Sequence, residues 1–280
     1  MTNLVPTPGI PTRARAGRRS WLAALGACSL VVAVAAPAGA ITGGQPDGGR
    51  HPYVGGTVLY FPPRDETIVN CTGSLISNTI FVTAAHCGRD GFRVSISLDE
   101  VFDADTSPRH PGTFIAHPDY DPAHESKNDV AVIQLDGPVP GVDASQLPKL
   151  PKPGMLDRMK DEASLRGSSF TSVGFGVRGY TTGPGGRMRV RGQARYTSVG
   201  SFSSLTPNQL HLSQNPSLGD GGTCDGDSGG PNFLGAGPDE TLIIAGLTST
   251  GDTYCQATNV TYRLDTDIAR SFLGQFVALP

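Results

Sequence analysis

The chain has 280 residues, of which 37 are glycine and 17% are charged, and its formal net charge is −3 at pH 7. Its first forty residues contain four arginines and no acidic residue, so the remaining 240 residues carry 18 basic and 25 acidic side chains, a formal charge of −7. Such an acidic chain is not expected to bind nucleic acid or an anionic membrane surface. The length after residue 40 indicates one large all-β unit or two small domains.

Residues 1–40 are predicted to be an export signal. Their basic region ends in Arg18-Arg19, and an uncharged apolar run over 21–36 leads to the small residues Ala38-Gly39-Ala40. The run is too short for a membrane-spanning helix. The arginine pair leaves the choice between general and twin-arginine export open. We therefore expect a secreted, extracellular protein that is not bound to a membrane once the signal is removed.

Short β-branched runs between glycine- and proline-rich turns predict an all-β fold after residue 40. The clearest runs are 54–60, 80–83, 130–135 and 242–247. Residues 136–168 are rich in proline and charge and are expected to cross between two halves, with a short helical turn conceivable at 155–163. Apolar residues then recur at helical spacing and predict an amphipathic C-terminal helix over about 266–277. They are Ile268, Phe272, Phe276 and Val277.

The cysteines after the predicted signal are even in number: Cys71, Cys87, Cys224 and Cys255. An even count in an exported chain indicates disulfides, and four cysteines allow three pairings. A metal site is the alternative, but these residues lack the close Cys-x-x-Cys spacing typical of one. No metal and no other cofactor is therefore expected.

Ser228 lies in a run of small residues, Gly226-Asp227-Ser228-Gly229-Gly230-Pro231. A serine hydroxyl attacks a carbonyl only when a base takes its proton and donors hold the resulting oxyanion. Glycines without a Cβ let the backbone approach a substrate closely. His86 in Thr83-Ala84-Ala85-His86-Cys87 offers the base, and Asp129 offers a carboxylate to orient it. Each residue alone is more often structural, but the three together favour acyl-transfer chemistry.

The chain order His86, Asp129, Ser228, with separations of 43 and 99 residues, and the sequences around these residues resemble the chymotrypsin/trypsin family of serine proteases. The resemblance extends from Ile41 to about Phe276. It implies one protease domain, 41–280, built of two six-stranded antiparallel β-barrels (about 41–150 and 165–265) and a C-terminal α-helix. It implies a monomeric endopeptidase that cleaves proteins or peptides through an acyl-enzyme and that protein protease inhibitors can block.

The same resemblance assigns roles within the site. Ser228 is the nucleophile, His86 the general base and then acid, and Asp129 the group that fixes the histidine tautomer. The backbone N–H groups of Gly226 and Ser228 form the oxyanion hole. The implied disulfides are Cys71–Cys87 beside the histidine and Cys224–Cys255 beside the serine.

Asp227 is expected to need a partner, because a buried unpaired carboxylate is costly. The resemblance implies that this partner is the ammonium group of a new N-terminus at Ile41. Ala38-Gly39-Ala40 directly precedes Ile41, so removal of the signal alone would create this terminus. Cleavage after Ala36 would instead leave a short propeptide.

Gly222 stands six residues before Ser228, where trypsin-like relatives carry an aspartate at the floor of the substrate pocket. Without that carboxylate a lysine or arginine of the substrate lacks its counter-charge, which favours small or medium apolar residues. Asp220 and Asp225 nearby leave some attraction for basic groups open. The other expected pocket residues are Thr223 at the floor, Ser249, Thr250 and Gly251 in the strand that pairs with substrate, and Val260 at the back wall.

The chain departs from the resemblance at Thr72, where a glycine usually follows the first cysteine, and at Phe175, where a tryptophan is usual. Two other functions fit parts of the sequence. Gly226–Gly230 also fits the nucleophile elbow of α/β-hydrolases, but those enzymes have their histidine after the serine, and no histidine follows Ser228. The second is a catalytically inactive relative that acts as a secreted binding or adhesion module, although this chain keeps every residue of the triad.

Overall fold

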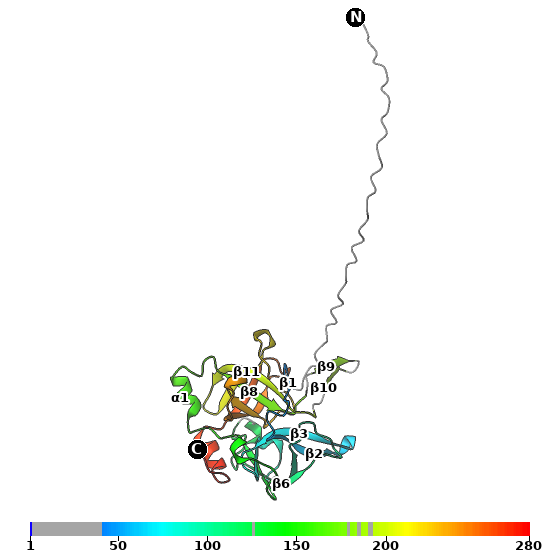
Figure 1. Ribbon diagram of the computed structural model, residues 1–280, viewed down its shortest axis with the longest axis vertical. Coiled ribbons are helices and arrows are strands. Elements are labelled where there is room, and N and C mark those ends of the chain that lie inside the picture. Colours follow the sequence, from blue (N-terminus) through cyan, green and yellow to red (C-terminus); the bar gives the residue numbers. More distant parts are fainter. Residues whose placement is uncertain (2–40, 125–126, 178–179, 184–185, 190–192) are drawn as a thin grey trace, which may run out of the picture. The chain divides into compact units, whose positions relative to one another are not determined.

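The computed structural model describes residues 1, 41–124, 127–177, 180–183, 186–189 and 193–280, with only the backbone described at 180–183 and 186–189. The predicted export signal lies outside the described residues. The part that follows it consists mainly of β-strands (Figure 1).

The first half of the fold is a closed barrel of six antiparallel strands in the order β2-β3-β4-β7-β6-β5. Its strands are β2 (Val54–Phe61), β3 (Glu66–Leu75), β4 (Ile80–Thr83), β5 (Arg93–Ser97), β6 (His110–Ala116) and β7 (Ala131–Leu135). The barrel closes because β2 pairs with both β3 and β5. Phe81, Phe114 and Ile133 are almost completely buried and fill its interior, as expected for β-branched and aromatic residues on pleated strands.

The second half is also a six-stranded antiparallel barrel. Its strands are β8 (Ser169–Gly174), β11 (Tyr196–Leu205), β12 (Gln209–Ser213), β13 (Pro231–Leu234), β14 (Ile244–Gly251) and β15 (Thr258–Arg263). They follow the order β11-β12-β15-β14-β13-β8, and pairing of β11 with β8 closes the circle. The short strand β1 (Gln45–Pro46) joins β11 at the edge, and β9 (Tyr180–Gly183) forms a hairpin with β10 (Gly186–Arg189). The predicted fold of two six-stranded barrels is confirmed.

Two α-helices accompany the barrels, α1 (Met155–Asp161) and α2 (Asp267–Leu273). The hydroxyl of Thr266 caps α2 by accepting the N–H of Ala269 at 3.3 Å. The predicted helix over 266–277 is therefore right in place but too long. Phe276 lies beyond the helix, and its ring packs against that of Phe272 at 5.3 Å, so the apolar spacing continues into a packed tail. The described residues also form six short 3₁₀ turns, at 62–64, 85–87, 122–124, 144–146, 216–218 and 237–239.

Buried charges fasten the N-terminal segment to the second barrel. Asp47 is 1% exposed and accepts bonds from Nε of Arg195 at 2.9 Å and Nδ1 of His51 at 2.5 Å. Nε2 of His51 lies 2.7 Å from Oε1 of Glu240. Burial alone would raise the pKa of Asp47, but its bonds to His51 and Arg195 lower that pKa to about 2. Burial likewise opposes the charge of His51, yet its two carboxylate partners raise the pKa of this imidazole.

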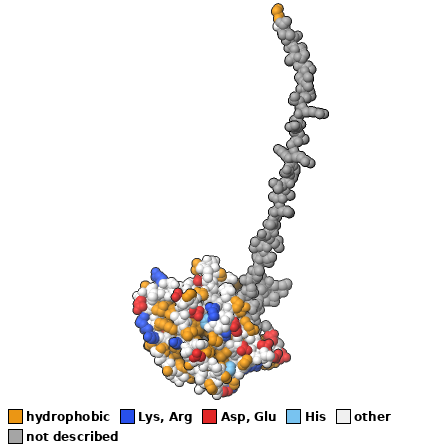
Figure 2. Space-filling view, in the orientation of Figure 1, with side chains coloured by type: hydrophobic (Ala, Val, Ile, Leu, Met, Phe, Trp, Pro, Cys, Tyr) orange, Lys and Arg blue, Asp and Glu red, His pale blue; other side chains and the backbone are white. Residues whose placement is uncertain are grey.

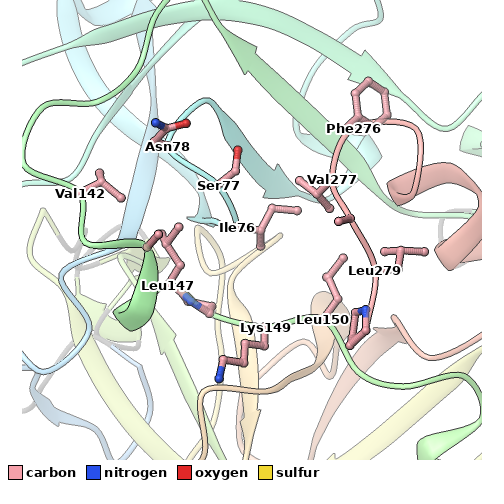
Figure 3. A pocket seen from close by; sticks show the side chains of 14 residues that line it. Ile76, Ser77, Asn78, Val142, Leu147, Lys149, Leu150, Phe276, Val277 and Leu279 are labelled. Atoms are coloured by element: carbon pink, nitrogen blue, oxygen red, sulfur yellow. The ribbon is translucent and has the colours of Figure 1, made fainter.

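A mostly apolar cavity of about 680 Å³ lies between the β3–β4 turn and the C-terminal tail (Figure 3). Ile76, Leu150, Phe276 and Leu279 are among the side chains that line it, whereas His86, Asp129 and Ser228 are not. The cavity is therefore separate from the predicted catalytic residues.

Charged side chains of both signs are visible on the face that Figure 2 draws. Figure 2 shows basic side chains near α1, where Arg158 and Lys160 are exposed, and acidic ones near the end of the β2–β3 hairpin, where Asp65 and Glu66 are exposed. Among the described residues, the structure has no helix with the length and apolar character needed to cross a membrane.

Candidate active site

His86 lies in the 3₁₀ turn that follows β4, and Asp129 precedes β7, the neighbour of β4 in the barrel. Nδ1 of His86 lies 2.8 Å from Oδ2 of Asp129, and the backbone N–H of His86 donates to Oδ1 at 3.0 Å. Asp129 is completely buried, while the histidine side chain is 25% exposed. Both carboxylate oxygens therefore hold the histidine, and Nε2 is the ring nitrogen that does not face the carboxylate.

The second barrel also holds Asp129. Ser249 on β14 donates its hydroxyl to Oδ2 of Asp129 at 2.5 Å. The neighbouring residue, Asn128, has a φ of 58°, a left-handed conformation that asparagine tolerates better than most residues. Its side chain donates to the carbonyl of Asp119 at 3.0 Å. The carboxylate is thus fixed by contacts from both halves of the fold.

Ser228 lies in a loop pressed against the histidine turn. A Cβ on Gly229, whose φ is 77°, would lie 2.1 Å from Oγ1 of Thr83, so only glycine fits here. Thr72 donates its N–H to the carbonyl of Ser228 at 2.8 Å. Sγ of Cys87, the residue after His86, lies 3.6 Å from the same carbonyl oxygen. The structure therefore brings the predicted nucleophile segment next to the predicted base.

Some N–H groups of the serine loop bond to carbonyl groups of the protein, and others do not. Asp227 donates to the carbonyl of Cys224 at 3.0 Å, and Gly229 donates to that of Thr248 at 2.7 Å. No hydrogen bond within the described part of the chain uses the N–H of Gly226 or Ser228. These are the two donors that the sequence assigns to an oxyanion hole.

Thr72 is a site residue that sequence reasoning did not identify. Its hydroxyl donates to the carbonyl of Gly226 at 2.9 Å and accepts the N–H of Phe175 at 3.1 Å, and the side chain is completely buried. One residue thus connects the serine loop with the segment after β8. The signal was present in the sequence, because Thr72 is a position where the chain departs from its family resemblance.

We expect Thr72→Val to lower kcat by about ten- to a hundredfold with little change in KM, because two buried backbone groups lose their partner and the serine loop loosens. Thr72→Ser keeps the hydroxyl and should retain activity. The measurement is steady-state kinetics on a peptide substrate, normalised by active-site titration. Unchanged kcat in folded Thr72→Val would show that the hydroxyl does not position the loop.

Asp227, the residue before Ser228, is completely buried. Its carboxylate accepts the N–H of Gly176 at 2.7 Å and that of Cys224 at 2.8 Å. Burial raises the pKa of Asp227 to about 7, the negative charge of Asp225 adds to the effect, and the two N–H bonds only partly oppose it. A cation beside this carboxylate would stabilise its charged form.

Ile41 is also completely buried, against Tyr196. The carbonyl of the next residue, Thr42, accepts the N–H of Gly222 at 2.9 Å. In this chain, which still continues before Ile41, no hydrogen bond or ion pair of the described residues joins Ile41 to Asp227. The φ of Ile41 is 68°, a left-handed conformation that is costly for a β-branched residue.

The predicted pocket residues lie in the segment before Ser228, at the end of β14 and on β15. Gly222 and Thr223 are buried, and the disulfide Cys224–Cys255 joins their segment to the loop after β14, with 5.3 Å between the two Cα atoms. Thr250 and Gly251 form the exposed end of β14. Val260 pairs with Thr250 but is only half-buried, whereas its neighbours Asn259 and Thr261 are buried and face inward. The inward side chain at this point of β15 is therefore that of Asn259.

The second disulfide, Cys71–Cys87, lies beside the histidine and has a Cα–Cα distance of 6.0 Å. Both pairs are those that the family resemblance implied. Cys71, His86 and Cys87 also form the cluster of potential metal ligands found within the described part. Because both sulfurs are in the disulfide, neither can provide the thiolate that a metal requires.

Comparison with known proteins agrees with this geometry. The family model named Trypsin matches residues 46–272, which include both barrels' strands from β2 onward and all three predicted catalytic residues. The chain is 28% identical over 204 residues to a protein named chymotrypsin from Phaedon cochleariae, a match that covers 69% of this chain and 67% of that relative. The chain therefore belongs to the trypsin family of serine proteases.

Proposed function

We propose that this protein is a secreted serine endopeptidase that hydrolyses peptide bonds through an acyl-enzyme on Ser228. The observation that carries the proposal is the buried Asp129 carboxylate bonded to His86, with the glycine-framed Ser228 loop packed against the same turn. The predicted export signal and the two disulfides favour an extracellular site of action.

The residues divide the chemistry as follows. Oγ of Ser228 attacks the scissile carbonyl carbon while Nε2 of His86 takes the hydroxyl proton, and Asp129 stabilises the imidazolium. The N–H groups of Gly226 and Ser228 hold the tetrahedral oxyanion. His86 then gives the proton to the leaving amine as the C–N bond breaks. Water, deprotonated by His86, attacks the acyl-enzyme, and the proton returns to Ser228 as the acid leaves.

Activation in this proposal depends on a cut before Ile41. The new ammonium group moves next to Asp227 and supplies the missing counter-charge, which orders the loop that carries Gly226 and Ser228. Two observations on the uncleaved chain support this step: the raised pKa of Asp227 and the left-handed φ of Ile41. The cut would give the carboxylate a cation and would free Ile41 from its costly conformation. The active form is expected to be a monomer that protein protease inhibitors can block.

Labelling with a fluorophosphonate tests the proposal against the inactive binding module. The probe phosphonylates only a serine whose nucleophilicity is raised by its neighbours. We expect the cleaved protein to be labelled, with the label mapped to Ser228 by peptide analysis, and to hydrolyse a peptide library. A folded, correctly cleaved protein that reacts with neither would be a binding module.

A further inference from the structure

A buried glutamine lies between the serine segment and the end of β14. Gln214 follows β12, and its side chain is completely buried. A Cβ on Gly222 would lie 2.0 Å from Oε1 and 2.3 Å from Cβ of Gln214. A Cβ on Gly251 would lie 3.9 Å from Nε2. The glutamine therefore occupies the volume into which a side chain at position 222 would point, and its amide extends toward the end of β14.

The serine segment and β14 meet beside the predicted nucleophile. There the N–H of Gly229, next to Ser228, donates to the carbonyl of Thr248 at 2.7 Å, so the two segments meet. The Cys224–Cys255 disulfide joins the same segments farther along. A substrate carbonyl carbon bonded to Ser228 would therefore direct the side chain of its own residue, the acyl-side residue, between the segments and toward Gln214.

The amide of Gln214 has a fixed orientation. Its Nε2 donates to Oδ1 of Asp252 at 3.1 Å. Asp252 is itself held by the N–H groups of Ala257 at 2.7 Å and Thr258 at 2.9 Å. Since Nε2 must face the carboxylate, Oε1 must face the other way, toward Gly222. Among the described residues this oxygen is buried and has no hydrogen-bond partner.

A second side-chain amide, that of Asn259, also has a buried oxygen without a hydrogen-bond partner among the described residues. Asn259 on β15 is 1% exposed, and its Nδ2 donates to Oδ1 of Asn232 at 2.9 Å. Its own Oδ1 is buried without a partner among the described residues. Asn259 pairs with Leu212 of β12, two residues before Gln214, so the register places both amides on one face of the sheet. This face of the sheet thus carries two buried, neutral hydrogen-bond acceptors without a partner among the described residues.

We propose that Gln214 determines specificity for the acyl-side residue, selecting a medium-length side chain with a neutral N–H donor, such as asparagine, over its apolar isostere leucine. The proposal rests on the protease function proposed above. The amide fills the volume that a long side chain needs, so phenylalanine and arginine are excluded. A buried acceptor without a partner is unfavourable, and a donor from the substrate relieves it where leucine does not.

The test compares substrates that differ only at the acyl-side residue: asparagine, leucine, alanine, phenylalanine and arginine. For the wild-type enzyme we expect kcat/KM for asparagine to exceed that for leucine by about tenfold or more. Gln214→Met keeps the length and removes the acceptor, so it should reverse this order, and Gln214→Ala should admit phenylalanine. Gln275→Met, an exposed glutamine in the C-terminal tail, is the matched control and should change nothing.

Wild-type enzyme that prefers leucine or arginine over asparagine would overturn the proposal, whether or not the variants fold. So would Gln214→Met that keeps the wild-type order. Fluorophosphonate labelling separates these outcomes from failure of the proposed function: a labelled enzyme with another preference refutes only the role of Gln214. An unlabelled, inactive wild-type protein refutes the protease function itself.

Discussion

Replacing Ser228 by alanine is expected to lower kcat/KM for a peptide substrate by about 10⁴-fold or more, because the nucleophile is lost while substrate binding remains. His86→Ala should cost a similar factor, since the base and the nucleophile act as one unit. The double variant should therefore be no slower than either single one. Steady-state hydrolysis by the cleaved, purified variants measures the effect, with unfolding curves to show that the fold is kept.

Ser271→Ala is the matched control, because Ser271 is an exposed serine on α2, far along the chain from the site. It should leave kcat/KM unchanged. Normal turnover by folded Ser228→Ala would contradict an acyl-enzyme on this residue, and additive losses in the double variant would contradict a shared role of His86 and Ser228.

Cleavage before Ile41 is expected to raise activity by about a hundredfold or more, because an unformed oxyanion hole costs about that factor. Asp227→Asn in the cleaved protein should cause a similar loss, since the amide cannot pair with the ammonium group. A form that begins at Ala40 should resemble the uncleaved chain. The three forms are compared by active-site titration and by turnover of one peptide substrate.

In the uncleaved chain, the protonation of Asp227 should also make the unfolding free energy depend on pH. The pKa of this carboxyl is about 7 in the folded chain, well above its ordinary value of 3.8, so the folded state holds the proton more tightly. The unfolding free energy should therefore be highest below pH 4 for this group and fall as the pH rises toward 7, by up to about 4 kcal/mol. Denaturant unfolding at pH 5 and pH 8 measures the fall.

Asp227→Asn in the uncleaved chain is the control for this pH dependence and should remove it. The cleaved enzyme should show a smaller fall, because the ammonium of Ile41 favours the charged carboxylate. Full activity in a form that retains Ala40 would contradict the activation step. If the unfolding free energy of the uncleaved chain and that of its Asp227→Asn variant depend on pH equally, the pKa of Asp227 is not raised by the lack of a cation.

Local patterns explain why the barrels could be predicted and why the candidate catalytic residues could be proposed from the sequence. The run 130–135 shows its strand character in its own sequence, and β7 (Ala131–Leu135) follows it closely. Ser228 and His86 are each marked by their immediate neighbours. The C-terminal helix was predicted too long because Phe276 keeps the apolar spacing although Gly274 follows the last helical residue.

Contacts between distant residues explain what could not be predicted. Oγ1 of Thr72 bonds the carbonyl of Gly226, 154 residues later, and no local pattern indicates such a partner. Gln214 meets Gly222 only because β12 and the serine segment come together in the folded barrel. The pocket role of Val260 stays a prediction, and the sequence did not indicate that its neighbour Asn259 is the more deeply buried of the two.

The contacts between Asp47, His51 and Arg195 are made by charged groups. Each disulfide instead has one cysteine in the segment of a predicted catalytic residue, because Cys87 follows His86 and Cys224 precedes Ser228. A thiol reductant acts only on the second kind of link. Reduction would therefore release the catalytic loops while the N-terminal segment remains attached to the second barrel. Reducing conditions would then disturb the segments around His86 and Ser228 more directly than the folding of the two barrels.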